Sequence, residues 1–162
     1  MELKEREDTG VIDVEWFAEP YGTVQMEARY WLYQKDSENF FGELEFVREH
    51  FQQIYDSFLE HLFVEYTNNP LDDVWDEETG KSERIMFSKK EEMHPYLGML
   101  PCIDIKSYKE RVLFGLSFYK HNRISIEHGL CAVYDKLDLL LMDAYDFVGI
   151  VDNFKYGYYG GF

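Results

Sequence analysis

The sequence predicts an α+β fold in which a single twisted sheet packs on one long helix. Two segments near the start carry apolar residues at every second position, and the next segment carries them at three- and four-residue steps. Several short segments rich in β-branched and aromatic residues follow. This order of a hairpin, a helix and a strand meander favours one sheet whose apolar face is covered by the helix.

An N-terminal β-hairpin is expected first, after a polar leader at residues 1–9. Ile12, Val14 and Trp16 share one face of the first segment, which indicates a strand with that face buried. The alternating apolar positions of the second segment are Val24, Met26, Ala28, Tyr30 and Leu32. The Pro-Tyr-Gly sequence at 20–22 lies between the two segments and is typical of a turn.

One long amphipathic helix is expected from about Gly42 to Thr67. Its apolar residues form a broad stripe and are Phe46, Val47, Phe51, Ile54, Tyr55, Phe58, Leu59, Leu62, Phe63 and Tyr66. The Asn-Asn-Pro sequence at 68–70 ends the helix, because proline disfavours helical geometry in the residue before it.

The segment from Leu71 to Pro95 is polar and charged, and a long loop or a short irregular helix anchored by Trp75 is expected there. The four segments CIDIKSY, RVLFGLSFY, GLCAVYD and LDLLLMDAYDFVGIV then predict a three- or four-stranded antiparallel meander. The Gly/Tyr-rich residues 153–162 are expected to be irregular. No linker divides the chain, so residues 1–162 are predicted to form a single domain.

Composition and charge limit the classes of function. Hydrophobic residues make up 46% of the chain, which provides enough apolar area for a packed core. Lys and Arg total 16 against 32 Asp and Glu, a net charge of −16. A field of this sign repels nucleic acid and anionic membranes and favours cationic partners. Acidity that serves solubility alone explains the same composition equally well.

The cysteines and the apolar runs indicate a soluble, cytoplasmic protein. Cys102 and Cys131 lie in apolar surroundings outside any Cys/His array, which argues against zinc and fits a reducing compartment. No apolar run reaches the roughly 18 residues that span a bilayer. The charged start MELKEREDTG lacks the apolar core of a signal peptide.

The pair Glu127-His128 is the one candidate for catalysis, as an acid/base pair of a small hydrolase or metal-dependent enzyme. Adjacent strand residues point to opposite faces, however, so the two side chains would not converge on one substrate. The structural alternative is that Gly129 adopts a positive φ or a bulge at a strand start while the pair holds the turn. The sequence favours this alternative, and no catalytic residue is assigned.

The other histidines are given structural positions. His50 is expected to pack at the edge of the helix stripe with a hydrogen bond, and His61 lies on the same flank too far away to share a metal ion with it. His94 is expected in a loop and His121 in a solvated turn.

An acidic stretch without Lys or Arg runs between Arg48 and Lys81. Its carboxylates are Glu49, Asp56, Glu60, Glu65, Asp72, Asp73, Asp76, Glu77 and Glu78. Carboxylates steer a basic partner, and an aromatic side chain supplies a desolvated anchor. The candidate partner-binding residues are Glu65, Asp72, Asp73, Trp75, Asp76, Glu77 and Glu78. A solvated helix face followed by a flexible loop is the alternative. The spacing does not match an EF-hand, and neither a metal ion nor a cofactor is assigned.

The stretch VLFGLSFYKHNRISIEHGLCAVYDKLDLLLMD resembles a bacterial domain family of unknown function that is immunity-protein-like. An F-G-L-x-F strand followed by an E-H-G-L turn carries the resemblance, at Phe114, Gly115, Leu116, Phe118, Glu127, His128, Gly129 and Leu130. The resemblance implies a bacterial immunity protein that neutralises a basic toxin by covering its active surface. The leading expectation is therefore a non-enzymatic, acidic protein-binding domain. The alternatives are the hydrolase centred on Glu127 and His128 and a homodimer that uses exposed aromatic residues.

Overall fold

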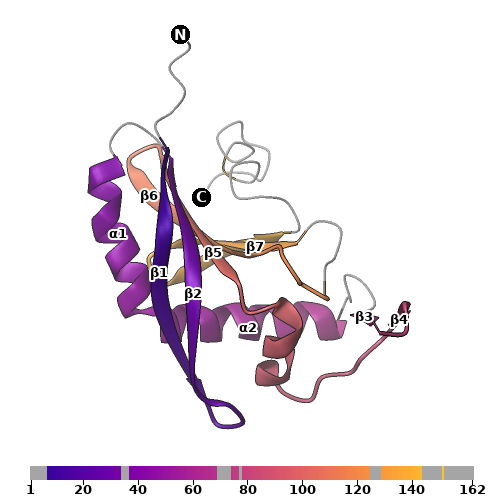
Figure 1. The fold of residues 1–162 in the computed structure, drawn as a ribbon. Coiled ribbons are helices and arrows are strands. Elements are labelled where there is room, and N and C mark those ends of the chain that lie inside the picture. Colours follow the sequence, from indigo (N-terminus) through magenta and orange to yellow (C-terminus); the bar gives the residue numbers. More distant parts are fainter. Residues whose placement is uncertain are drawn as a thin grey trace.

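The computed structural model describes residues 7–33, 37–68, 74–76, 78–124, 129–143 and 151. These residues form an α+β fold with a six-stranded sheet, two α-helices, a 3₁₀ helix and a separate two-stranded sheet (Figure 1). The predicted α+β class is therefore confirmed, whereas the predicted single sheet is not, because a second, two-stranded sheet is present. The segment 153–162, which was expected to be irregular, lies outside the described residues.

The main sheet has the strand order β1-β2-β5-β6-β7-β8. Its strands are β1 (Glu7–Ala18), β2 (Gly22–Tyr33), β5 (Pro101–Tyr108), β6 (Arg111–Phe118), β7 (Leu130–Asp135) and β8 (Asp138–Asp143). Neighbouring strands are antiparallel except β2 and β5, which are parallel. The N-terminal hairpin and the antiparallel meander are both present as predicted, and the parallel pair joins them into one sheet.

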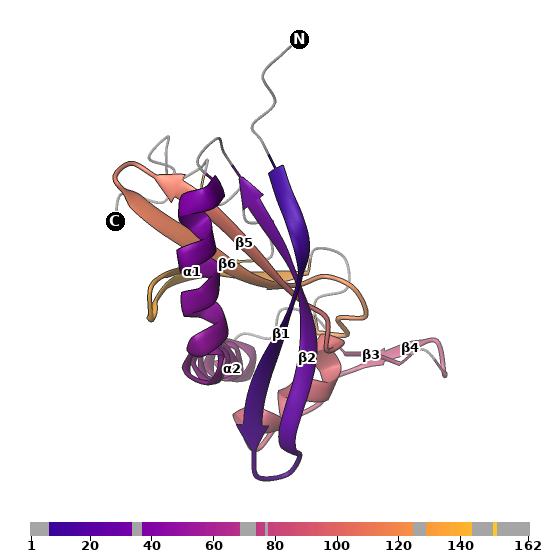
Figure 2. The same ribbon diagram turned by 60° about the vertical axis from the view of Figure 1, so that its left-hand side comes forward.

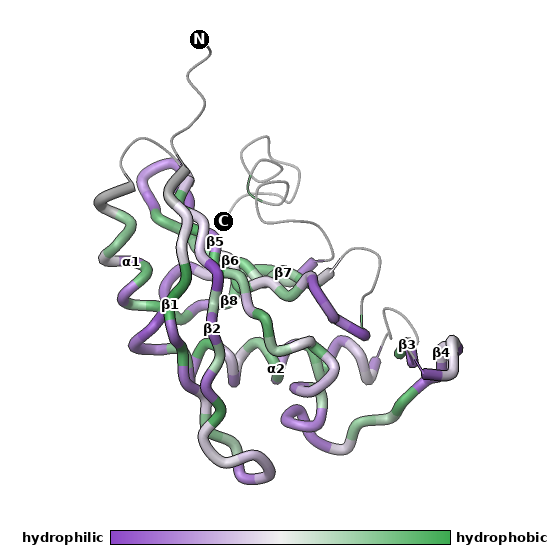
Figure 3. The backbone as a smooth tube through the Cα atoms, in the orientation of Figure 1, coloured by the Kyte–Doolittle hydropathy of each residue, from purple (hydrophilic) through white to green (hydrophobic). Residues whose placement is uncertain are grey.

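The hairpin follows directly from its alternating pattern. Trp16 pairs with Val24 and Val14 with Met26, and the side chains of Val14, Trp16 and Met26 are buried on one face. The turn closes where the Tyr21 N–H donates to the Ala18 carbonyl at 2.9 Å. Figure 3 shows hydrophobic and hydrophilic residues alternating along these two strands. One face of the hairpin therefore belongs to the core, and the other faces outward.

The predicted single helix is wrong, because the chain forms α1 (Ser37–Glu49) and α2 (Phe51–Asn68) with a change of direction at His50. Figure 2 shows α1 from the side and α2 nearly end-on. The His50 N–H donates to the Phe46 carbonyl at 3.0 Å, and the His50 Nδ1 lies 2.9 Å from the same oxygen. A side chain that competes for a helix carbonyl is a known cause of a kink. The hydrogen bond expected for His50 is thus present, and it lies at the break between the two helices.

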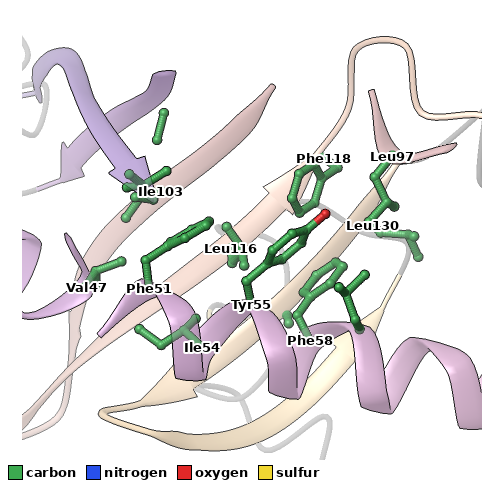
Figure 4. Close-up of a cluster of buried hydrophobic side chains, with 14 of the residues drawn as sticks. Val47, Phe51, Ile54, Tyr55, Phe58, Leu97, Ile103, Leu116, Phe118 and Leu130 are labelled. Carbon is green, nitrogen blue, oxygen red and sulfur yellow. The ribbon is translucent and has the colours of Figure 1, made fainter. Parts of the chain in front are cut away.

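The core lies between the helices and the sheet. Figure 4 shows Phe51, Tyr55 and Phe58 of α2 packed against side chains of the central strands. The buried residues of α2 are Phe51, Ile54, Tyr55, Phe58, Leu59, Leu62 and Tyr66, which agrees with the predicted stripe. The Tyr134 hydroxyl of β7 donates to the Ile54 carbonyl at 3.0 Å, which ties the sheet to α2.

The sheet is not covered on one face only. A second buried cluster, formed by Tyr108, Leu113, Cys131, Val133 and Val151, lies on the face away from the helices. β6 and β7 therefore bury residues on both faces, and their sequences are more continuously apolar than those of the hairpin.

The polar segment before β5 is more ordered than expected. β3 (Val74–Asp76) pairs with β4 (Lys81–Glu83) in a second small sheet, and η1 (Lys90–Leu97) is a 3₁₀ helix. The expectation of a short irregular helix fits η1, whereas the small hairpin was not anticipated. None of the helices among the described residues has the length and apolar content needed to cross a membrane.

Candidate functional site

Glu127 and His128, the candidate catalytic pair, lie outside the described residues. Their neighbour Gly129 is described and has a φ of +71°, directly before the start of β7. A Cβ atom at Gly129 would lie 2.4 Å from Cδ1 of Tyr119 and 3.0 Å from the Phe118 carbonyl oxygen. The positive φ expected at this strand start is therefore present, and close packing adds a second requirement for glycine.

Two carboxylates of the acidic stretch each have a partner from outside that stretch. Asp56 accepts a hydrogen bond from Nε1 of Trp16 at 2.8 Å and another from Nε2 of Gln52 at 3.0 Å. Glu60 lies 3.7 Å from Nζ of Lys90 in η1. Asp56 is thus a structural carboxylate between α2 and β1, and Glu60 is not without a counter-charge.

Of the candidate partner-binding residues, the side chains of Glu65, Asp76 and Glu78 are described. Glu65 is exposed on α2, 3.9 Å from Nε2 of His61, and Glu78 is exposed in the β3–β4 turn. Oδ1 of Asp76 accepts the Glu78 N–H at 2.9 Å, so Asp76 shapes that turn. Asp72, Asp73, Glu77 and the side chain of Trp75 lie outside the description.

His94 is not the loop residue that was expected. It belongs to η1 and is only 2% exposed, with Nδ1 2.6 Å from the Tyr55 hydroxyl and its ring 4.7 Å from that of Trp16. Burial lowers the pKa of His94 to about 4, so the ring is neutral at pH 7. Nδ1 of the neutral ring shares a hydrogen bond with the Tyr55 hydroxyl, and this histidine is part of the packed core.

Among the described strands, β1 lies at one edge of the main sheet and is paired only with β2. The Phe17 N–H donates to Oε1 of Gln52 at 2.7 Å, and Nε2 of Gln52 donates to the Phe17 carbonyl at 3.0 Å. The backbone of Phe17 therefore faces away from β2. Alternation along an antiparallel strand directs the backbone groups of residues 11, 13 and 15 to the same open edge.

This open edge borders a groove of about 610 Å³. The groove is lined by Asp13, Glu15, Trp16, Phe17, Thr23, Gln25, Arg48, Glu49 and Gln52. Asp13, Glu15 and Glu49 are exposed carboxylates, and Nε2 of Gln25 donates to Glu15 at 2.8 Å. Arg48 already pairs with Glu45, its Nε lying 3.0 Å from Oε2. The groove therefore combines unpaired strand backbone with net negative charge.

The sequence contains one signal of this edge, which is the presence of large apolar residues on the otherwise polar face of the strand. Val11 and Phe17 are 55% and 54% exposed, although their strand has a buried opposite face. Large apolar residues on the polar face of an alternating strand indicate contact with something outside the core. The outward residues of β1 are therefore candidates for binding in addition to the acidic stretch.

Among the described residues, no group of three or more His, Cys, Asp or Glu side chains is placed to hold a metal ion. Comparisons with protein-family models, curated proteins and solved structures find no match to this chain.

Proposed function

We propose that this chain is a non-enzymatic protein-binding domain whose β1 edge accepts an extended, basic segment of a partner. The observation that carries the proposal is the open backbone of residues 11–15 beside an acidic groove. Addition of a strand to an exposed sheet edge is a common mode of peptide recognition, because main-chain hydrogen bonds supply affinity.

Gln52 supports the geometry of this mode. Its carboxamide has the same donor and acceptor arrangement as a peptide group, and it bonds both backbone groups of Phe17. The added segment would continue this pairing toward Val11. None of the described side chains hydrogen-bonds the outward backbone of Val11, Asp13 or Glu15, so those groups are available to a partner.

The side chains of β1 define the chemistry of the partner. The odd-numbered residues 11–17 share one face, with apolar side chains at both ends and the carboxylates of Asp13 and Glu15 between them. Opposite charges on directly facing strand positions stabilise a pair. A complementary segment therefore carries Lys or Arg at two alternate central positions with apolar residues on either side.

A second copy of this chain fits the edge less well. Symmetric pairing of β1 with β1 would place the Asp13 and Glu15 carboxylates of the two copies near each other, and like charges on facing strands are destabilising. The homodimer considered from the sequence is thus disfavoured at this edge.

The test uses a labelled peptide, Leu-Thr-Lys-Thr-Lys-Thr-Leu, and a control peptide with Glu in place of Lys. We expect the basic peptide to bind by fluorescence anisotropy and to slow amide hydrogen exchange at Asp13 and Glu15. Asp13→Pro should abolish binding, because proline has no N–H to offer the added strand. Asp13→Asn should retain the backbone pairing and lose only the salt-sensitive part of the affinity. Equal binding of both peptides, or unchanged exchange at β1, would refute the proposal.

The resemblance to immunity-like domains supports a specific form of this function, in which the partner is a basic toxin whose active surface the complex covers. The expected result is that this chain inhibits a toxin domain encoded beside it and that Asp13→Pro does not. Inhibition by both proteins would place the toxin-binding surface elsewhere.

A further inference from the structure

We propose that the face of the sheet opposite α1 and α2 carries a binding site for a small planar aromatic anion. A cavity of about 480 Å³ lies over β2 and β5 at the point where the hairpin meets the meander. Protein pockets that bind small molecules have volumes of about 300–1,000 Å³. This site shares Val11 with the β1 edge but lies mainly over β2 and β5, and it does not depend on the proposed function.

The strand register builds the floor of the cavity. Val11 pairs with Arg29, and Arg29 pairs with Cys102, so these three side chains form one row across β1, β2 and β5. Trp31 pairs with Asp104 in the next row on the same face. The parallel pair of β2 and β5 therefore sets the relative positions of the side chains that a ligand would touch.

Aromatic side chains supply most of the apolar contact. The rings of Trp31 and Tyr33 stack with their centroids 6.4 Å apart and their planes 19° from parallel, and Tyr119 lines the cavity next to Lys120. A planar apolar molecule is the shape that stacked rings accommodate with the largest buried area. The aromatic part of the ligand is inferred from this arrangement.

The charge of the ligand is inferred from the cations of the cavity. Arg29 and Lys120 both line it and both are exposed, and neither forms an ion pair with any described residue. Arg29 is the register partner of Cys102 on the neighbouring strand, and Lys120 lines the same cavity as these two residues. A carboxylate placed over Cys102 would meet both cations, and a guanidinium binds a carboxylate through two parallel hydrogen bonds.

The acidic residues of the cavity do not reverse this preference. Asp104 is only 8% exposed and accepts a hydrogen bond from the Tyr33 hydroxyl at 3.2 Å, so its carboxylate is already occupied. Glu27 is exposed on β2 and is the one remaining acid of the described lining. Cys102 itself is neutral, since burial and Asp104 raise the pKa of its thiol.

The binding test compares three probes of similar size: 2-naphthoate, 2-naphthylmethanol and 2-naphthylmethylammonium. Isothermal titration calorimetry should show binding in the order anion, neutral, cation. Arg29→Gln and Lys120→Gln should each weaken naphthoate binding about tenfold, as expected for one charged hydrogen bond. Arg48→Gln is the matched control, since Arg48 lies in the other groove, and it should leave naphthoate affinity unchanged.

A second readout locates the ligand. Cys102 is partly exposed and Cys131 is buried, so N-ethylmaleimide should modify Cys102 first in the native protein. Naphthoate at saturation should slow that modification several-fold, and the ammonium probe should not. Equal affinity for the anion and the cation, or an unchanged rate at Cys102 with naphthoate bound, would overturn the proposal. Asp13→Pro should leave both readouts unchanged, which separates this site from the β1 edge.

Discussion

At the scale of single residues, His94 is a titratable group that the fold keeps neutral. It lies among the rings of Trp16, Tyr21 and Tyr55 and hydrogen-bonds the Tyr55 hydroxyl. Protonation would place a charge in this aromatic cluster, and the pKa of His94 is accordingly lowered from 6.5 to about 4. The folded state therefore binds this proton less tightly than the unfolded state does.

The first prediction concerns the pH dependence of stability. Because the unfolded chain takes up the proton at higher pH, the stabilisation by neutral His94 is complete above pH 6.5 and is lost as the pH falls to about 4. The free energy of unfolding falls by at most about 3 kcal/mol over this pH interval because of His94. The stability difference between the wild type and His94→Gln, measured by urea unfolding, should shrink over this interval. A difference that stays constant with pH would contradict the assignment. His121→Gln, at an exposed turn position, is the control.

The second prediction separates two reasons for a glycine. Gly129 and Gly22 both have positive φ, at 71° and 67°, but a Cβ atom would meet Tyr119 at 2.4 Å only at Gly129. Gly22→Ala should lower the free energy of unfolding by about 1 kcal/mol, from backbone strain alone. Gly129→Ala should cost about 1–3 kcal/mol more, because the added methyl group overpacks the site. Equal losses in urea unfolding would show that Tyr119 moves aside freely.

Gly129 and His94 also show how far the sequence predicts the structural role of a single residue. Gly129 was recognisable, because a glycine at a strand start indicates special backbone geometry. His94 was not, because the residues that bury it come from β1 and α2, far away in the sequence. The neighbouring Met93 and Leu97, four residues apart and both buried, were the only local sign of a packed segment.

At the scale of elements, the backbone of β1 has two kinds of position, those that pair with β2 and those that face the open edge. Backbone groups of the even-numbered residues pair with β2, whereas those of the odd-numbered residues face the open edge or Gln52. Proline removes one N–H donor and is tolerated in a strand only where that donor faces away from the sheet.

The third prediction follows from this difference. Val14→Pro should destabilise the protein by about 3 kcal/mol or more, because it removes a ladder hydrogen bond and disturbs a buried position. Asp13→Pro, one residue away, should change the melting temperature by only a few degrees. The two variants are compared by thermal unfolding monitored by circular dichroism. Similar melting temperatures would mean that the edge is not where the hydrogen bonds place it.

Elements with a regular pattern were predictable, and the irregularities were not. The alternation of residues 11–17 predicted the hairpin face correctly, because a period of two has one structural meaning. The apolar period of α1 and α2 continues through His50, so the sequence predicted one helix. The His50 ring at this break contacts the Phe46 carbonyl, and the apolar periodicity of the sequence does not predict where such a break occurs.

At the scale of the whole molecule, the net negative charge destabilises the folded state. A net charge of −16 on 162 residues produces self-repulsion that is larger in the folded state than in the expanded chain. Local pairs such as Glu60 with Lys90 relieve it only in part, since the chain holds twice as many acids as bases.

The fourth prediction is that salt stabilises this protein. Raising NaCl from about 10 mM to about 150 mM shortens the screening length from about 30 Å to about 8 Å and should raise the melting temperature. The same change should weaken the basic peptide at β1 and the naphthoate site. A melting temperature that falls with NaCl would indicate that attractive surface pairs outweigh the repulsion.

The candidate sites were the least predictable part, because both are made by strand neighbours. The β1 groove needs α1 and α2 beside an edge strand, and the aromatic cavity needs β2 beside β5. The parallel pairing that aligns Arg29 with Cys102 joins residues that are far apart in the sequence. The carboxylates of the acidic stretch are close together in the sequence, and closeness in the sequence alone does not place side chains on one surface.

The same parallel pair determines the order in which the protein can assemble. Local contacts complete the hairpin and the meander separately, whereas β2 and β5 meet only after the long intervening chain has closed into a loop. Such a non-local contact slows folding. During synthesis the hairpin, α1 and α2 leave the ribosome before β5 exists. The unpaired edge of β2 therefore waits for β5, and a chaperone that shields this edge during the interval would increase the yield of folded protein.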